Sequence, residues 1–190
     1  MIGASVGAIA APSAGALEEA ESALQQARAE RWSAERLQGR VLEAAQAQTP
    51  CAFVALPRPA PSEDGEPLAE APYRAWAANG VRTVLVLCPA TLRLATEETG
   101  THINPDLRFT LFLGYRLLRT ADDEVLYDSV AIYRSPATRT LIAWGTDGAQ
   151  AFRTELEAGI REIVGKILDR LFLAETPATQ PAESLNRPGE

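Results

Sequence analysis

The most regular hydrophobic pattern in the chain is the alternation of apolar and polar residues between residues 107 and 134. Because strand side chains point alternately to opposite faces, this pattern predicts strands with one buried face. In the first run, one face holds Phe109, Leu111, Leu113, Tyr115 and Leu117, and the other holds Arg108, Thr110, Gly114 and Arg116. Turn-forming residues at 120–123 separate this run from a second one at 124–134, so we predict a long antiparallel hairpin.

The pattern after the hairpin changes to a helical period. Residues 141–144 are predicted to be a last short extended piece, and Asp147 with Gln150 has the spacing of a capping box that starts a helix. The apolar stripe of this amphipathic C-terminal helix consists of Phe152, Leu156, Ile160, Ile163, Val164, Ile167, Leu168, Leu171 and Phe172. We expect this stripe to cover one face of the sheet.

The amino-terminal part of the chain predicts one long helix over residues 17–48, which Thr49 and Pro50 end. The segment is rich in Ala, Glu, Gln and Arg, which are strong helix formers, and it would span about 45–50 Å. Its apolar stripe is narrow and rich in alanine, so this helix should bury little area per turn and leave surface for a partner.

Two short apolar runs, Cys51–Leu56 and Val81–Cys88, read as buried strands. A short helix within residues 68–79 lies between them and ends at Asn79 and Gly80. A strand, a helix and a strand in this order predict a right-handed crossover unit with parallel strands. Residues 91–96 alternate and predict a further short strand.

Together these patterns predict an α/β fold. It comprises a small mixed β-sheet with the long antiparallel hairpin, covered by the short crossover helix and the amphipathic C-terminal helix, and preceded by the long N-terminal helix. The predicted organisation is a small-residue segment at 1–16, the long helix at 17–48, the α/β domain at 49–173 and a disordered tail at 174–190. No apolar run is long enough to span a membrane.

The two cysteines are expected to be free, buried thiols. Cys51 opens one predicted strand and Cys88 closes its parallel neighbour, so their Cα atoms would lie roughly 20 Å apart at about 3.3 Å per residue. A disulfide requires Cα atoms within about 7 Å of each other.

The chain has a net charge of −7, which disfavours nucleic acid as a partner because an acidic surface repels the phosphate backbone. His102 is the single histidine and has no neighbour at metal-ligand spacing, and both cysteines lie in apolar runs. Asp122 and Asp123 are adjacent, but turn chemistry explains them. We therefore predict no catalytic residues, no metal and no cofactor. The alternative is a small hydrolase or ligand-binding enzyme with a site near His102, in the loop of residues 97–106.

Without a catalytic group, the long helix is the best candidate for a contact surface. Trp32 is a large aromatic residue on an otherwise polar helix, and exposed tryptophans often anchor interfaces. We predict an interface at Trp32, Leu24, Arg28 and Arg36, with a protein partner or a second copy bound through charge pairing. An unpaired sheet edge is a second candidate contact.

Residues 1–16 are small and apolar and end in Ala14-Gly15-Ala16, which resembles a signal-peptidase site. A basic region before the apolar stretch is missing. The segment is therefore either the remnant of an export signal or a small-residue segment that packs on the domain or on a partner.

Several motifs together resemble a class of bacterial envelope lipoproteins, with an α/β domain of the curli-secretion and TolB amino-terminal type. ABC-transporter auxiliary lipoproteins have a similar domain. The resemblance covers residues 35–173 and rests on CAFVALPRP at 51–59, VRTVLVLCP at 81–89, VLYD at 125–128, YRS at 133–135, Trp144 and the amphipathic helix that follows.

The resemblance implies an accessory or scaffold protein of the periplasm, associated with the outer membrane, and not an enzyme. The chain departs from the class because the acylated cysteine near the start of such proteins has no counterpart here. We therefore expect membrane attachment only through a lipid anchor that this sequence does not carry.

Overall fold

The predicted hairpin forms the middle of the structure. The computed structural model describes residues 12–56, 73–96 and 104–173. Within them, β3 (Asp106–Arg119) pairs antiparallel with β4 (Val125–Thr140), from Asp106 opposite Thr140 to Leu118 opposite Val125. The turn between them places Asp123 at φ 60°, a left-handed conformation that Asp tolerates better than most residues. The hairpin prediction is confirmed, and the second strand runs further than the alternation alone indicates.

The other edge of β3 pairs with two short strands in succession. β1 (Thr83–Leu87) lies antiparallel to residues 115–119, and β2 (Thr91–Ala95) lies antiparallel to residues 108–112. The described sheet is therefore four-stranded and antiparallel, with β3 in the centre, β4 on one side and the broken strand β1–β2 on the other. The chain has a mixed α/β fold, as predicted.

The predicted parallel crossover is wrong. Residues 51–56 form no strand, and the helix α3 (Arg74–Ala77) is a single turn. The run at 51–56 pairs with no strand of the described sheet. It packs elsewhere, with the Phe53 ring 5.4 Å from that of Phe172.

The predicted long amino-terminal helix is two helices, α1 (Ala14–Arg31) and α2 (Ala34–Gln48). Trp32 and Ser33 between them are extended, and the Ser33 hydroxyl accepts a hydrogen bond from the Arg36 amide at 3.1 Å. Ser33 therefore acts as the N-cap of a second helix. The predicted end at Thr49 is confirmed.

The C-terminal helix α4 (Leu141–Leu168) begins directly at the end of β4, where Thr140 is its N-cap. Its backbone leaves the helical conformation at 146–149, with left-handed φ values of 54° at Asp147, 64° at Gly148 and 61° at Ala149. The extended piece predicted at 141–144 and the N-cap predicted at Asp147 are therefore wrong. The stripe that follows is confirmed, and a short π-helical turn, η1 (Asp169–Leu173), ends the helix.

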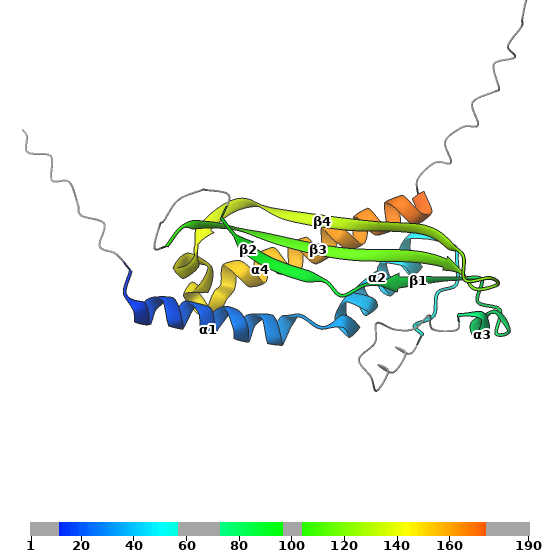
Figure 1. The fold of residues 1–190 in the computed structure, drawn as a ribbon, viewed down its shortest axis with the longest axis horizontal. Coiled ribbons are helices and arrows are strands. Elements are labelled where there is room, and N and C mark those ends of the chain that lie inside the picture. Colours follow the sequence, from blue (N-terminus) through cyan, green and yellow to red (C-terminus); the bar gives the residue numbers. More distant parts are fainter. Residues whose placement is uncertain (1–11, 57–72, 97–103, 174–190) are drawn as a thin grey trace, which may run out of the picture.

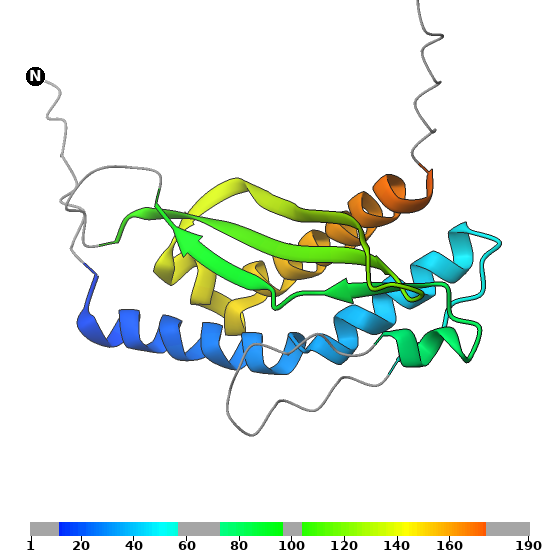
Figure 2. The same cartoon turned by 45° about the vertical axis from the view of Figure 1, so that its right-hand side comes forward.

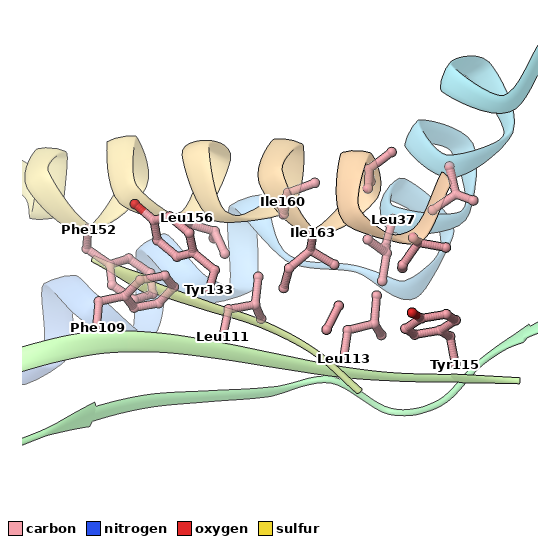
Figure 3. Packing of buried hydrophobic residues seen from close by; sticks show 14 of the residues in the cluster. Leu37, Phe109, Leu111, Leu113, Tyr115, Tyr133, Phe152, Leu156, Ile160 and Ile163 are labelled. Carbon is pink, nitrogen blue, oxygen red and sulfur yellow. The ribbon is translucent and has the colours of Figure 1, made fainter. Parts of the chain in front are cut away.

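The hydrophobic core lies between this helix and one face of the sheet. Phe109, Leu111, Leu113 and Tyr115 of β3 point towards α4 and meet Phe152, Leu156, Ile160 and Ile163 (Figure 3). The Trp144 side chain is fully buried, and its indole Nε1 donates a hydrogen bond to the Leu107 carbonyl at 2.9 Å. Burial of each larger side chain contributes about 1.5–3 kcal/mol.

The amino-terminal helices complete the core instead of projecting from it. Residues of both helices join the cluster under the sheet: Leu24, Ala27, Leu37, Val41 and Ala45. α1 approaches α4 so closely that a Cβ at Gly145 would lie 2.5 Å from the Cα of Ala20. The narrow alanine-rich stripe is what permits this close contact.

Figures 1 and 2 show α4 behind the strands, with α1 alongside it and α3 near the turn of the hairpin. No helix of the described residues crosses the front of the sheet in these views. We call this front surface the open face, and the opposite surface, under α4, the covered face. None of the described helices is long and apolar enough to cross a lipid bilayer.

The cysteines are free, as predicted, but they are not buried. Cys51 is exposed and Cys88 is half-buried. The expectation of buried thiols depended on two buried strands, and the first of them does not form.

Candidate functional site

The predicted interface residues lie around the junction of α1 and α2. Trp32 is half-buried and packs on the core, and together with Gln25, Arg28 and Ala29 it lines a shallow surface depression of about 280 Å³. Arg28 is exposed there and remains available to a partner. The structure thus keeps Trp32 and Arg28 together at the surface.

The other two predicted residues have structural positions. Leu24 belongs to the core and is 9% exposed. The Arg36 guanidinium donates hydrogen bonds to the carbonyls of Glu30 and Arg31, at 3.1 Å and 3.4 Å. These carbonyls belong to the last turn of α1, where a cation is favoured by the helix dipole. Arg36 therefore holds α1 and α2 together.

The paired aspartates lie in the hairpin turn, as the sequence indicates. Asp122 binds Arg119, with Oδ1 and Oδ2 both 3.0 Å from guanidinium nitrogens, and Asp123 binds Arg74 of α3 at 2.9 Å. Their partners are arginines of the fold, so both carboxylates stabilise the turn. His102 lies outside the described residues, and the enzyme alternative built on it stays untested. Over the described ranges, no three His, Cys, Asp or Glu side chains gather as metal ligands.

A surface groove of about 480 Å³ lies over the left-handed turn of α4. Arg139, Thr146, Asp147, Gln150, Thr154 and Glu155 contribute its polar lining. The Tyr133 hydroxyl donates a hydrogen bond to the Glu155 carboxylate, and burial, followed by this carboxylate, raises the pKa of Tyr133. A tyrosine held neutral in this way remains a hydrogen-bond donor and holds the Glu155 carboxylate in place.

A pair of tyrosines lies at the far end of the covered face. The rings of Tyr115 and Tyr127 stack with centroids 5.8 Å apart. The Arg170 guanidinium hydrogen-bonds to Tyr127 and lowers its pKa, whereas burial raises the pKa of Tyr115. This cluster fixes η1 against the sheet.

The open face is the one large surface of the sheet without a helix over it in the described part of the chain. The register arranges its side chains in rows across the strands. From one end these rows are Arg93, Thr110 and Arg134, then Thr91, Phe112 and Ile132, then Gly114 and Val130, and then Val86, Arg116 and Asp128.

The centre of the open face is apolar. Val130 is 54% exposed and Ile132 is 37% exposed, and the half-buried Phe112 lies opposite Ile132. The Arg93 guanidinium lies over the Phe112 ring at 5.7 Å. Exposed large apolar side chains that adjoin one another and are rimmed by charge are typical of a protein-binding surface.

This surface was missed from the sequence, although the signal was present. The alternating pattern assigned the polar face of the first run to Arg108, Thr110, Gly114 and Arg116, and Phe112 stands in the middle of that series. A phenylalanine on the polar face, with Val130 and Ile132 at matching positions of the next strand, indicates an apolar strip on the solvent side.

Two features limit the extent of the open face. At the hairpin turn, α3 lies beside it, and Val84 and Leu118 are buried there (Figure 1). Along the outer edge of β4, the Lys166 ammonium donates a hydrogen bond to the Ile132 carbonyl at 2.8 Å. A lysine on an outward carbonyl opposes pairing with another strand, so the face is more accessible to a partner than this part of the edge.

A scan against protein-family models and searches of curated proteins and of solved structures find no match to this chain.

Proposed function

We propose that this protein is a non-catalytic accessory or scaffold protein of the bacterial envelope, which binds a partner protein through the open face of its sheet. The observation that carries the proposal is the apolar strip of Phe112, Val130 and Ile132 on a face that no described helix covers. A face of an antiparallel sheet can be solvated, but then it is normally polar.

The depression at Trp32 is a weaker candidate for the same role. Its tryptophan is half-buried and one of its predicted members, Leu24, is in the core. The open face presents two exposed large apolar side chains, Val130 and Ile132, on a strand that is fixed by pairing with β3. A rigid platform favours binding because little conformational entropy is lost there.

Site-specific photo-crosslinking in the native cell tests which surface is used. A photoreactive phenylalanine analogue at Val130 should give a discrete protein adduct, and the substitution Ile132→Asp should abolish it. The exposed Thr154 of α4 offers a matched control, since Thr154→Asp should leave the adduct intact. An adduct from the analogue at Trp32, with none at Val130, would place the interface at the α1–α2 junction and refute the open-face proposal.

The envelope part of the proposal rests on the resemblance to envelope lipoproteins and on residues 1–16. In the structure Ala14, Gly15 and Ala16 form the first turn of α1, and the Ser13 hydroxyl caps it by accepting a hydrogen bond from the Ala16 amide. Cell fractionation combined with mass determination of the mature amino terminus tests this location. Recovery of the intact protein in the cytoplasmic fraction would contradict it.

A further inference from the structure

If the open face binds a protein, as proposed above, its charges restrict the chemistry of the partner. Arg93, Arg116 and Arg134 accompany the apolar strip, and Asp128 is the acidic residue in the same rows. Arg116 and Asp128 neutralise each other, with Nε 2.8 Å from Oδ2. The face therefore keeps a positive excess, whereas the whole chain has a net charge of −7.

The excess charge comes from two arginines at one end of the strip. Arg93 and Arg134 both lie opposite Thr110, on either side of β3, so their Cα atoms are about 10 Å apart across two strand spacings. Both are exposed, and neither makes an ion pair with a carboxylate in the part of the chain that the structure describes. Within the described ranges, two guanidinium groups without a carboxylate partner thus border the row of Phe112 and Ile132.

This arrangement disfavours two other occupants. A second copy bound face to face about an axis along the strands would bring Arg93 and Arg134 of both chains together, with like charges in contact. About an axis across the strands, the two arginines would meet the Arg116–Asp128 end of the other copy, which is already neutralised. A single-stranded nucleic acid would need several stacking aromatics, whereas Phe112 is the one aromatic residue in these rows, and the rest of the chain is acidic. The complementary partner is an acidic protein segment.

We infer that the open face binds a segment of a partner protein in which carboxylate and apolar side chains alternate. Its apolar side chains cover Phe112, Val130 and Ile132, and its carboxylates pair with Arg93 and Arg134. Guanidinium groups suit this role because their planar donors match both oxygens of a carboxylate. Contact with the partner also shields these pairs from water, which strengthens them relative to fully exposed ion pairs.

Labelled synthetic peptides test this inference directly on the full chain by fluorescence anisotropy. The probe is a short peptide in which glutamate and leucine alternate, and the comparison peptides carry lysine or serine in place of glutamate. We expect the glutamate peptide to bind in a salt-dependent manner. The double substitution Arg93→Glu and Arg134→Glu should weaken it by at least about tenfold, which corresponds to about 1.4 kcal/mol.

Two controls separate charge from folding. Arg161→Glu reverses an exposed arginine on α4 and should leave peptide binding unchanged. The doubly reversed protein should prefer the lysine peptide to the glutamate peptide, while its circular dichroism spectrum and unfolding midpoint match those of the wild type. Unchanged binding of the glutamate peptide to the doubly reversed protein, no binding to the wild type, or equal binding of oligothymidylate would each overturn the inference.

Failure of this inference and failure of the proposed function give different experimental results. If the Val130 crosslink to a partner survives the reversal of Arg93 and Arg134, the face is a binding surface but the inferred acidic chemistry is wrong. If the Val130 adduct is a dimer of this chain, and sedimentation equilibrium shows self-association that Ile132→Asp abolishes, the occupant is a second copy and both proposals are overturned.

Discussion

The covered and open faces of the sheet differ in their surroundings more than in the residues that β3 contributes to them. Leu111 and Leu113 are each 1% exposed on the covered face, and the half-buried Phe112 between them points to the open face. All three are large apolar residues in consecutive positions of one strand. The difference between them is α4, which packs on one side of the strand and not on the other.

The comparison separates residues that stabilise the fold from residues that are free to bind. On the covered face, close packing means that the loss of a methylene group leaves a cavity. On the open face the same loss changes little, because water already reaches the side chain. Stability measurements on matched pairs can therefore break or sharpen the distinction between the faces.

The largest expected effect is a cavity on the covered face. Leu113→Ala should lower the free energy of unfolding by about 2–5 kcal/mol, because the fully buried site cannot collapse around the smaller side chain. Val130→Thr, on the neighbouring strand but on the open face, should change it by no more than about 0.5 kcal/mol. Urea unfolding followed by circular dichroism measures both. Equal losses for the two variants would show that something covers the open face as well.

The next effect concerns the contact that holds α1 on α4. Gly145→Ala should cost about 1–3 kcal/mol, because the new Cβ would lie 2.5 Å from the Cα of Ala20 and the helices would have to separate. Gly165→Ala is the matched control in the same helix. A Cβ at Gly165 meets nothing within 4 Å, so this variant should be neutral or more stable by up to about 1 kcal/mol. If the unfolding midpoint of Gly145→Ala equals that of the wild type, the close approach of α1 to α4 is contradicted.

The smallest effect is electrostatic and joins the same two helices. Arg153 lies 2.6 Å from the Glu30 carboxylate, and its hydrogen bond, followed by that of Gln26, lowers the pKa of Glu30 below the ordinary value of 4.5. A carboxyl group with a lowered pKa stabilises the folded state at neutral pH and loses this contribution as the pH falls through its folded-state pKa.

Glu30→Gln should therefore unfold slightly more easily than the wild type at neutral pH and match it in strongly acidic buffer. Thermal unfolding of both proteins across the acidic range measures the difference. A gap of constant size at all pH values would mean that the carboxylate charge is not the cause. Glu19→Gln on the exposed surface of α1 controls for the loss of a surface charge.

Much of the secondary structure could be predicted because it depends on local patterns. The hairpin follows from strict alternation over a long stretch, and the stripe of α4 follows from its helical period. The errors arose where the correct assignment depended on only a few residues. Cys51–Leu56 has the composition of a strand, but it packs through Phe53 on Phe172 at the end of the C-terminal helix. One long run of helix formers hid the cap at Ser33.

The candidate site was harder to predict than the fold. Trp32 was predicted to be an interface anchor because it is an aromatic residue on a polar helix, whereas the structure places it between two helices that both contribute to the core. The strip of Phe112, Val130 and Ile132 involves two strands, and it becomes visible only when the register of the hairpin places Ile132 opposite Phe112. Sequence alternation gave each residue a face but did not show which residues adjoin.

By itself, the sequence determined the hairpin and the C-terminal helix, because the hydrophobic pattern of each repeats regularly along a single strand or helix. It also determined the acidic balance of the chain. The tertiary structure alone decided which face of the sheet is covered, where the long helix divides and which arginines lack a counter-charge among the described residues. These properties depend on packing between segments far apart in the chain, where one helix excludes water from one side of a strand and leaves the other side free.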